Sequence, residues 1–142
     1  MAYELGKDWR VYVGDGGGTE VFSALGGEGS FDFQRSSNEI DPSTKDDSDY
    51  ALANFGLMKI AISVSGNVKL PDTALERLMD KAKHATDKTT NIQIKDGTIV
   101  KYAGEVAVGG NGITAGKDGA VSYSFTLVAS AAPTTDDMAA TA

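Results

Sequence analysis

The chain has 142 residues, of which 41% are hydrophobic, with 17 glycines and only three prolines, and this size and composition predict one globular, turn-rich domain covering residues 1–142. It has no cysteine, which excludes disulfides, thiolate metal sites and thiol nucleophiles. The formal net charge of −7 argues against a conventional nucleic-acid-binding surface, because neutralising phosphates requires clustered Lys and Arg.

The first part of the chain predicts short strands separated by glycine-rich turns. Residues 9–13 and 19–24 are predicted strands, and the glycine-rich residues 14–18 form the turn between them. Residues 30–36 alternate, so that Phe31 and Phe33 share one face of a strand, while the opposite face carries Ser30, Asp32 and Gln34.

Residues 37–56 have no clear period and carry five carboxylates against a single Lys45. A loop of about 20 residues is uncommon in a compact domain unless it has a function. Four of its side chains are poorly suited to a solvated linker and are predicted to pack on another surface: Ile40, Tyr50, Leu52 and Phe55. The acidic cluster lacks the spacing of a calcium-binding loop, so we expect a solvated acidic segment rather than a cation site.

Residues 57–70 give the strongest strand pattern, followed directly by a helix. The apolar positions of this strand are Met58, Ile60, Ile62, Val64, Val68 and Leu70, and its opposite face carries Lys59, Ala61, Ser63, Ser65, Asn67 and Lys69, with a bend expected near Gly66. The helix is predicted over about residues 71–86, with an apolar stripe made of Leu75, Leu78, Met79, Ala82 and Ala85. Thr73 and Glu76 have the spacing of a capping box.

The last part of the chain predicts a hairpin and a closing strand. Residues 90–95 and 98–108 flank Asp96-Gly97, a strong signal for a two-residue hairpin turn. The glycine-rich residues 109–112 are expected to end the second strand. Residues 120–130 alternate as a further strand, and residues 131–142 are predicted to form a flexible tail.

Few side chains suit catalysis. The only histidine, His84, lies beside Lys83 at the end of the helix, where a surface role at the helix terminus is expected. The glycine run 14–18 precedes a strand and lacks the phosphate-loop pattern, and no serine lies in a G-x-S-x-G motif. We therefore predict no enzyme activity, no catalytic residues, no metal and no cofactor. The absence of a long apolar run predicts no membrane insertion, and the first residues lack a signal-peptide pattern.

One pattern remains after these exclusions. Four strands have a second face that is small and polar with little charge, formed by Ser30, Asp32 and Gln34, by Ser63, Ser65 and Asn67, by Lys101, Ala103 and Glu105, and by Ser122, Ser124 and Thr126. Ordinary sheets facing water often carry more Lys and Glu. A plain solvent-exposed face is the alternative interpretation.

This layout resembles that of the major tail tube proteins of long-tailed bacteriophages and phage-like gene-transfer particles. The resemblance covers nearly the whole chain. It rests on Gly6-Lys7-Asp8 before a strand, the strand with Phe31-Asp32-Phe33, the long polar loop, and the long strand 58–70. It continues with the helix at 72–85, the hairpin, the closing strand 121–127 and a small-residue tail.

The resemblance implies a mainly β fold, an antiparallel β-sandwich or small barrel flanked by one helix. It also implies a structural virion protein whose hexameric rings stack into the tail tube, the conduit for DNA delivery, assembled in the host cytoplasm. Residues 37–56 would be an inter-subunit loop, and the two termini, including an N-terminal arm at 1–8, would join rings. The implied partners are further copies of the chain, tape-measure and tail-terminator proteins, and DNA that passes without specific binding.

The polar face is then expected to line the lumen of the tube, through Asp32, Gln34, Ser63, Ser65, Glu105, Ser122 and Ser124. An acidic or neutral channel of small residues lets DNA slide, because phosphates are retained by basic groups. Two alternatives stay open: a secretion-system tube protein of the same architecture, and a non-catalytic β-sandwich module that binds carbohydrate or adheres to a surface. Both contractile and non-contractile tails also remain compatible with the sequence.

Overall fold

The computed structural model describes residues 3–40, 45 and 54–140. It is mainly antiparallel β-sheet with one α-helix in the described residues, which confirms the predicted fold class. The strands are β1 (Trp9–Gly14), β2 (Phe22–Ala24), β3 (Glu28–Ile40), β4 (Asn54–Asn67), β5 (Thr89–Asp96), β6 (Ile99–Thr114), β7 (Ser122–Ala129) and β8 (Thr135–Asp136). A short 3₁₀ helix, η1 (Gly6–Asp8), precedes β1, and α1 spans Thr73–Lys83.

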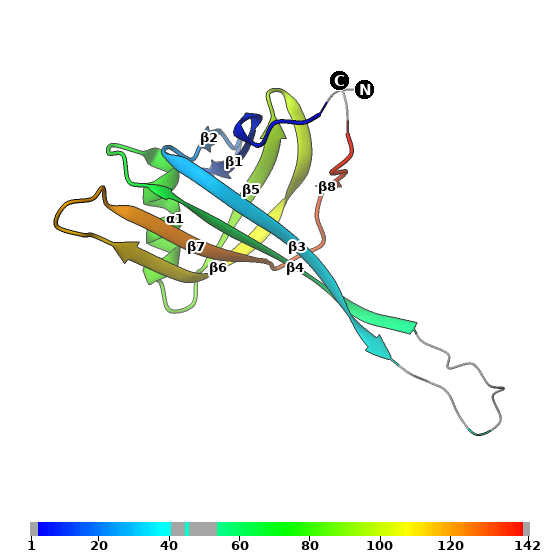
Figure 1. Ribbon diagram of the computed structural model, residues 1–142. Coiled ribbons are helices and arrows are strands. Elements are labelled where there is room, and N and C mark those ends of the chain that lie inside the picture. The colour runs from blue at the N-terminus through cyan, green and yellow to red at the C-terminus, as the bar shows by residue number, and fades with distance from the viewer. Residues whose placement is uncertain (1–2, 41–44, 46–53, 141–142) are drawn as a thin grey trace.

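The strands form one sheet in the order β2-β1-β5-β6-β7-β4-β3, with β8 beside β6, and this sheet folds into two layers without closing into a barrel (Figure 1). The 16-residue β6 belongs to both layers, because its first half pairs with β5 and its second half pairs with β7. We call β3, β4, β7 and the second half of β6 the front layer. The back layer consists of β2, β1, β5 and the first half of β6.

The hydrophobic core lies between the two layers and α1. The front layer contributes Ile60, Ile62, Val64, Tyr123, Phe125 and Leu127, the back layer Val11, Val13, Ile92 and Ile94, and the helix Ala74, Leu75 and Leu78. In β4 the alternation correctly identified the apolar face at Ile60, Ile62 and Val64, whereas Met58 and Leu70, predicted on the same face, are 61% and 71% exposed because they lie beyond the part of β4 that faces the core. No helix of the described part is both long enough and apolar enough to cross a membrane.

The start of α1 differs from the predicted capping box. Asp72, one residue before Thr73, is the N-cap, and its carboxylate accepts hydrogen bonds from the amides of Ala74 at 3.1 Å and Leu75 at 3.4 Å. The same carboxylate accepts the Gly26 N–H at 2.9 Å. The predicted Thr73–Glu76 box is therefore wrong, because a carboxylate one position earlier satisfies the free amides and also ties the helix to the chain before β3.

Residues 37–56 contain more strand than predicted. β3 continues to Ile40 and β4 begins at Asn54, and the two pair through Ser37 opposite Met58 and Glu39 opposite Phe55. The register shifts between Ser37 and Glu39, and this bulge breaks the period of two that would have revealed the strands in the sequence. β4 pairs with β7 only from Ala61 onward, so its first residues pair with β3 alone. We call this two-stranded projection, residues 36–40 and 54–59, the β3–β4 arm (Figure 1).

Two further predictions about chain ends are corrected. The glycines at 109–112 do not end the strand, since β6 runs to Thr114 with a bulge between Val108 and Gly110, stabilised by pairing with β7. The described part of the predicted flexible tail, residues 131–140, is held against β6: Thr135 pairs with Ala103, and the Asp137 N–H donates to the Lys101 carbonyl at 2.8 Å. Backbone pairing of this kind leaves little trace in side-chain patterns.

Candidate functional surfaces

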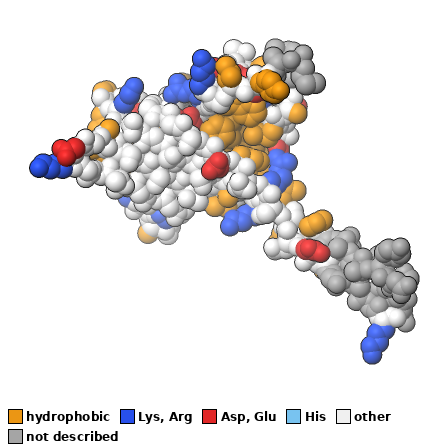
Figure 2. All heavy atoms as spheres, viewed as in Figure 1, with side chains coloured by type: hydrophobic (Ala, Val, Ile, Leu, Met, Phe, Trp, Pro, Cys, Tyr) orange, Lys and Arg blue, Asp and Glu red, His pale blue; other side chains and the backbone are white. Residues whose placement is uncertain are grey.

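The outward face of the front layer brings small residues from four strands into register. One row across the layer consists of Asp32, Ser63, Thr126 and Gly110, and the next consists of Ser30, Ser65, Ser124 and Gly112. Asn67, Ser122 and Thr114 continue the face at one end, and Gln34, Ala61, Val128 and Ala107 at the other. We call these four rows the polar face. Figure 2 shows this side of the molecule as a broad area with few hydrophobic or charged side chains.

The polar face is nearly neutral. Asp32 is the one charged residue in its four rows, and it is exposed. The Ser30 and Ser65 hydroxyls lie 3.3 Å apart across the strands. The glycines of β6 add no side chain at all, so the face is smooth as well as uncharged. Such a surface offers neither a cluster of cations to hold phosphate nor an apolar area for a protein partner.

Six of the seven sequence candidates for the lumen lie on this face: Asp32, Gln34, Ser63, Ser65, Ser122 and Ser124. Glu105 lies apart from them, because it is on the first half of β6, opposite Asn91 of β5, and its carboxylate accepts the Ser130 hydroxyl at 2.9 Å.

The expectation that Lys101 and Ala103 face outward is wrong. Both are buried, because the C-terminal segment covers this part of β6. The Lys101 ammonium donates to the Ala140 carbonyl and lies 4.8 Å from the centre of the Trp9 ring. These two contacts compensate the ammonium group for the water contacts that it loses on burial.

Both edges of the front layer lack a partner strand in the described residues. β3 is the terminal strand of the sheet. On the other side, pairing between β5 and β6 ends at Thr89 opposite Ala107, so the second half of β6 pairs with β7 alone. An unpaired edge presents free backbone donors and acceptors, which makes it a template for another strand.

The β3–β4 arm exposes apolar side chains. Among the described residues, Ile40 is 51% exposed, Phe55 70%, Met58 61% and Leu57 86%. Ile40 and Phe55 were predicted contact residues, whereas Tyr50 and Leu52 lie outside the described residues. Met58 was missed because it continues the alternation of Ile60 and Ile62 and was therefore predicted to face the core, and Leu57, at the start of the predicted strand, was assigned to neither face. A two-stranded ribbon is marginal in water by itself, so the arm is suited to packing on another molecule.

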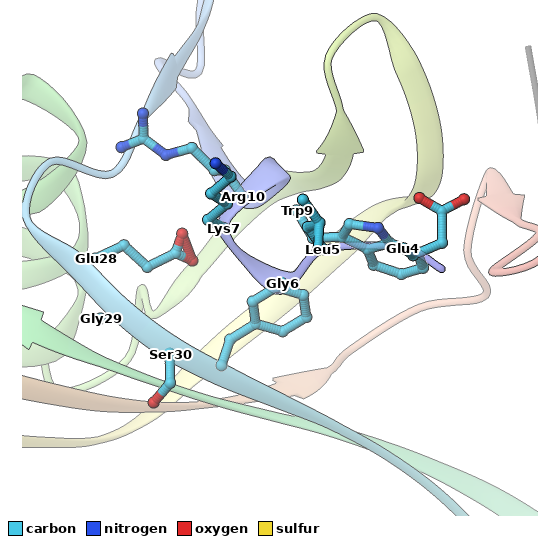
Figure 3. A pocket seen from close by; sticks show the side chains of 10 residues that line it. Glu4, Leu5, Gly6, Lys7, Trp9, Arg10, Glu28, Gly29 and Ser30 are labelled. Carbon is cyan, nitrogen blue, oxygen red and sulfur yellow. The ribbon is translucent and has the colours of Figure 1, made fainter. Parts of the chain in front are cut away.

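A pocket of about 530 Å³ lies between the N-terminal segment, the start of β1 and the start of β3 (Figure 3). The Glu28 carboxylate accepts the Val11 N–H, with both N–O distances at 3.3 Å, and the Arg10 guanidinium donates to the Leu25 carbonyl at 2.7 Å. Burial raises the pKa of Glu28, although the hydrogen bond from Val11 opposes this. Glu28 thus joins β3 to β1, and Arg10 joins β1 to the chain between β2 and β3, so both side chains have a structural role.

Comparison with known families gives a match over nearly the whole chain. Residues 4–135 match the model of the phage tail tube protein family. No curated protein sequence matches the chain. Across residues 3–40, 45 and 54–140, no group of three or more His, Cys, Asp or Glu side chains could hold a metal ion.

Solved structures with this fold come from several kinds of tail and tube. A chain from the tail of an empty gene transfer agent particle, with C6 symmetry, has 16% sequence identity and a TM-score of 0.74, with 94% of this chain and 98% of that chain covered. A chain of the SPP1 tail tube has 14% sequence identity and a TM-score of 0.67, with 88% of this chain and 74% of that chain covered. A chain of the sheath–tube complex of an extracellular contractile injection system has 16% sequence identity and a TM-score of 0.56, with 87% of this chain and 84% of that chain covered. At these identities the likeness concerns the fold.

Proposed function

The chain belongs to the phage tail tube protein family, and from this premise we propose that its copies assemble into hexameric rings that stack into a tail tube, the conduit for DNA delivery. The tube would be part of a virion or phage-like particle and would be assembled in the host cytoplasm. Tape-measure and tail-terminator proteins would be its other partners. Residues 1–8 and 131–142 are proposed to help join successive rings.

The observation that carries this proposal is the front layer, which has two unpaired edges and a smooth polar face between them. If the β3 edge of one copy pairs with the second half of β6 of the next, the contact is head-to-tail and the same on every copy. Such a contact generates a ring when the rotation closes. Ring closure would also remove both exposed edges, which otherwise favour aggregation.

The size of such a ring is compatible with DNA. Six front layers would form a barrel of roughly 24 strands, and with about 4.8 Å between strands and a tilt of about 40° the backbone diameter is roughly 45–50 Å. Because the polar face carries short side chains, most of that width would remain open, and the channel would be wider than a DNA duplex.

The polar face also has suitable chemistry for a conduit. With Asp32 as its charged residue, a ring would present carboxylates and hydroxyls to passing DNA. Repulsion between carboxylates and phosphates keeps the duplex away from the wall, while the absence of clustered cations prevents retention.

The test is assembly of the purified chain at increasing concentration, followed by light scattering and negative-stain microscopy. We expect sixfold rings or tubes. A chain that stays monomeric at high concentration, both alone and with tail-initiation proteins, would refute the proposal. The likeness to the contractile injection system supports a second candidate, an injection-system tube, and nuclease-protected DNA inside purified particles would favour the tail tube over it.

A further inference from the structure

The hydrophobic core of the front layer is incomplete at the two edge strands. Where β4 and β7 lie side by side inside the layer, their core-facing side chains are buried: Ile62, Val64, Tyr123, Phe125 and Leu127. At the edges, by contrast, Phe31 of β3 is only partly buried and Ile113 of β6 is 49% exposed. An apolar side chain on the core side of each edge is therefore left without full cover.

The pocket of about 530 Å³ beside the N-terminal segment lies at the β3 edge. We call it the N-terminal pocket. Its apolar lining consists of Leu5, Trp9 and Phe31, and Leu5 is 54% exposed. The N-terminal segment forms one side of the pocket and the start of β3 the other (Figure 3). The incomplete edge of the core and the pocket are thus one continuous apolar surface at the start of β3.

The strand directions determine which part of an adjacent copy would reach this pocket. β3 is antiparallel to β4, β4 to β7, and β7 to β6, so β3 and β6 run in opposite directions. In a ring whose copies share one orientation, the β3 edge therefore pairs antiparallel with the second half of β6 in the next copy. The start of β3 then lies beside the end of that β6, which carries Ile113.

The faces of the two edge strands also match. Along β6, Gly112 lies on the polar face, whereas Ile113 is opposite Tyr123 and lies on the core side. Along β3, Asp32 lies on the polar face and Phe31 on the core side. If the polar faces of all copies form one wall, Phe31 and the Ile113 of the next copy must lie on the same side of that wall, behind it.

We propose that Ile113 of the adjacent copy packs on Phe31 and closes the N-terminal pocket, so that the pocket is a site completed by a second copy of the chain. The inference rests on the proposed function and adds to it the contact behind the strand pairing within each ring. Backbone hydrogen bonds would join the two strands at the wall. Burial of the apolar side chains behind them would remove water from the joint.

The helix of the adjacent copy would accompany this strand. The Asn111 side-chain amide donates to the Met79 sulfur at 3.3 Å, and Met79 and Ile113 line the same surface between α1 and the end of β6. α1 therefore stands behind the part of β6 that would pair with β3. The pocket is larger than one isoleucine side chain, and the helix would supply the further surface that covers it.

Cysteine cross-linking of the full chain tests the contact directly, because the native sequence has no cysteine. Single variants Leu5→Cys in the pocket and Ile113→Cys on β6 are mixed under ring-forming conditions and treated with a short bis-maleimide. We expect a linked dimer that contains one chain of each variant. The matched control replaces Ile113→Cys by Ser124→Cys, an exposed position on the polar face, and should give no link.

A charge substitution tests whether the contact holds the ring together. Ile113→Asp should raise the protein concentration at which rings form at least about tenfold, because it places a carboxylate in an apolar joint. Val121→Asp is the matched control. Val121 is 39% exposed on the same surface as Ile113, but it precedes the inner strand β7, so its rings should form at the concentration of the unaltered chain. Circular dichroism checks the fold of both variants, and cross-linking decides if Ile113→Asp does not fold.

The outcomes separate this inference from the proposed function. If the unaltered chain forms rings but Leu5→Cys and Ile113→Cys do not link, or link no better than the control, the pocket contact is overturned while ring assembly stands. Folded Ile113→Asp that forms rings at the unaltered concentration would overturn it as well. Linking of Leu5→Cys to Leu57→Cys instead would assign the pocket to the arm of another copy. If the unaltered chain forms no rings, the proposed function fails and this inference fails with it.

Discussion

Reversing the charge of Asp32 should convert the proposed conduit into a trap for DNA. Asp32 is exposed on β3, opposite Ser63 on β4, in a face that has no other charged residue in its four rows. Asp32→Lys leaves the core untouched, because Phe31 and Phe33 on either side point to the other face of the strand. Tubes should therefore still assemble.

The size of the effect follows from counting phosphates. In a sixfold ring the substitution replaces about six carboxylates by about six ammonium groups, and each neutralised phosphate adds about 0.9 to the slope of log K against log salt concentration. If all six engage DNA, the slope is about −5, and retention falls by roughly 10³ between 50 and 200 mM salt. Successive rings along the tube repeat the same binding positions.

The assay is retention of fluorescent duplex DNA by assembled tubes over a series of salt concentrations. Asp32→Asn is the neutral control and should retain almost no DNA. A second control places the new lysine at exposed Thr86 beyond α1, where DNA binding should be weak, because the charge would lie outside the channel. Asp32→Lys tubes that assemble normally yet retain no more DNA than Asp32→Asn at 50 mM salt would refute the assignment of this face to the lumen.

Three further predictions concern the subunit, and each can be checked by denaturant or thermal unfolding. Asp72→Ala should lower the free energy of unfolding by about 2–3 kcal/mol, through the lost helix cap and the unpartnered Gly26 amide, whereas Thr73→Ala should change it by less than about 0.5 kcal/mol; equal effects would contradict the cap assignment. Gly27→Ala should lower the free energy of unfolding by about 3 kcal/mol or more. The reason is that φ is 67° at this position and the new Cβ would collide with the Asn67 carbonyl oxygen of β4. Gly97→Ala, at φ 64° with no atom within 4 Å of the new Cβ, should lower the free energy of unfolding by only about 1 kcal/mol. Similar losses in the Gly27 and Gly97 variants would show that the contact with the β4 carbonyl does not matter. Glu28→Gln should raise the melting temperature at pH 7, because a buried carboxyl with a raised pKa loses stability as pH rises from its usual value of 4.5 through the folded pKa; the gain should vanish below pH 4.5, and a gain that persists there would have another cause.

The parts of the fold that sequence reasoning identified have local signals. The hairpin between β5 and β6 was predicted from Asp96-Gly97; its connecting residues are Gly97 and Thr98, one position later, because Asp96 pairs with Ile99, and Gly97 has the positive φ of 64° that a two-residue turn requires. The polar face was recognisable because side chains alternate along a strand, so Ser63 and Ser65 had to share one face. Their alignment with Asp32 and Ser124 across strands needed the register, which no local pattern contains.

The missed features depend on contacts between distant segments. Asp72 became the helix cap because its carboxylate also binds Gly26, 46 residues earlier. Lys101 reads as an outward charge in the sequence, yet the C-terminal segment covers it and supplies a carbonyl to its ammonium. The strands of the arm were hidden by a bulge after Ser37. In each case the deciding partner is remote or irregular, and local periodicity has no access to it.

The glycines of the polar face lower the stability of the isolated subunit, and the proposed assembly would offset this loss. Gly110 and Gly112 make this face smooth, but glycine in a strand is less stable than alanine by roughly 0.5–1 kcal/mol per residue, and this part of β6 pairs only with β7. The subunit thus has a glycine-containing strand at one unpaired edge of the front layer and several exposed apolar residues on the arm, including Leu57 and Phe55. In the proposed ring, a neighbouring β3 would supply the missing hydrogen bonds at that edge, and contact with another copy would cover the apolar residues of the arm. In the proposed tube, the residues that weaken the isolated chain would therefore favour polymerisation, because assembly would satisfy the edge that the glycines leave weak and cover the apolar residues that the arm exposes.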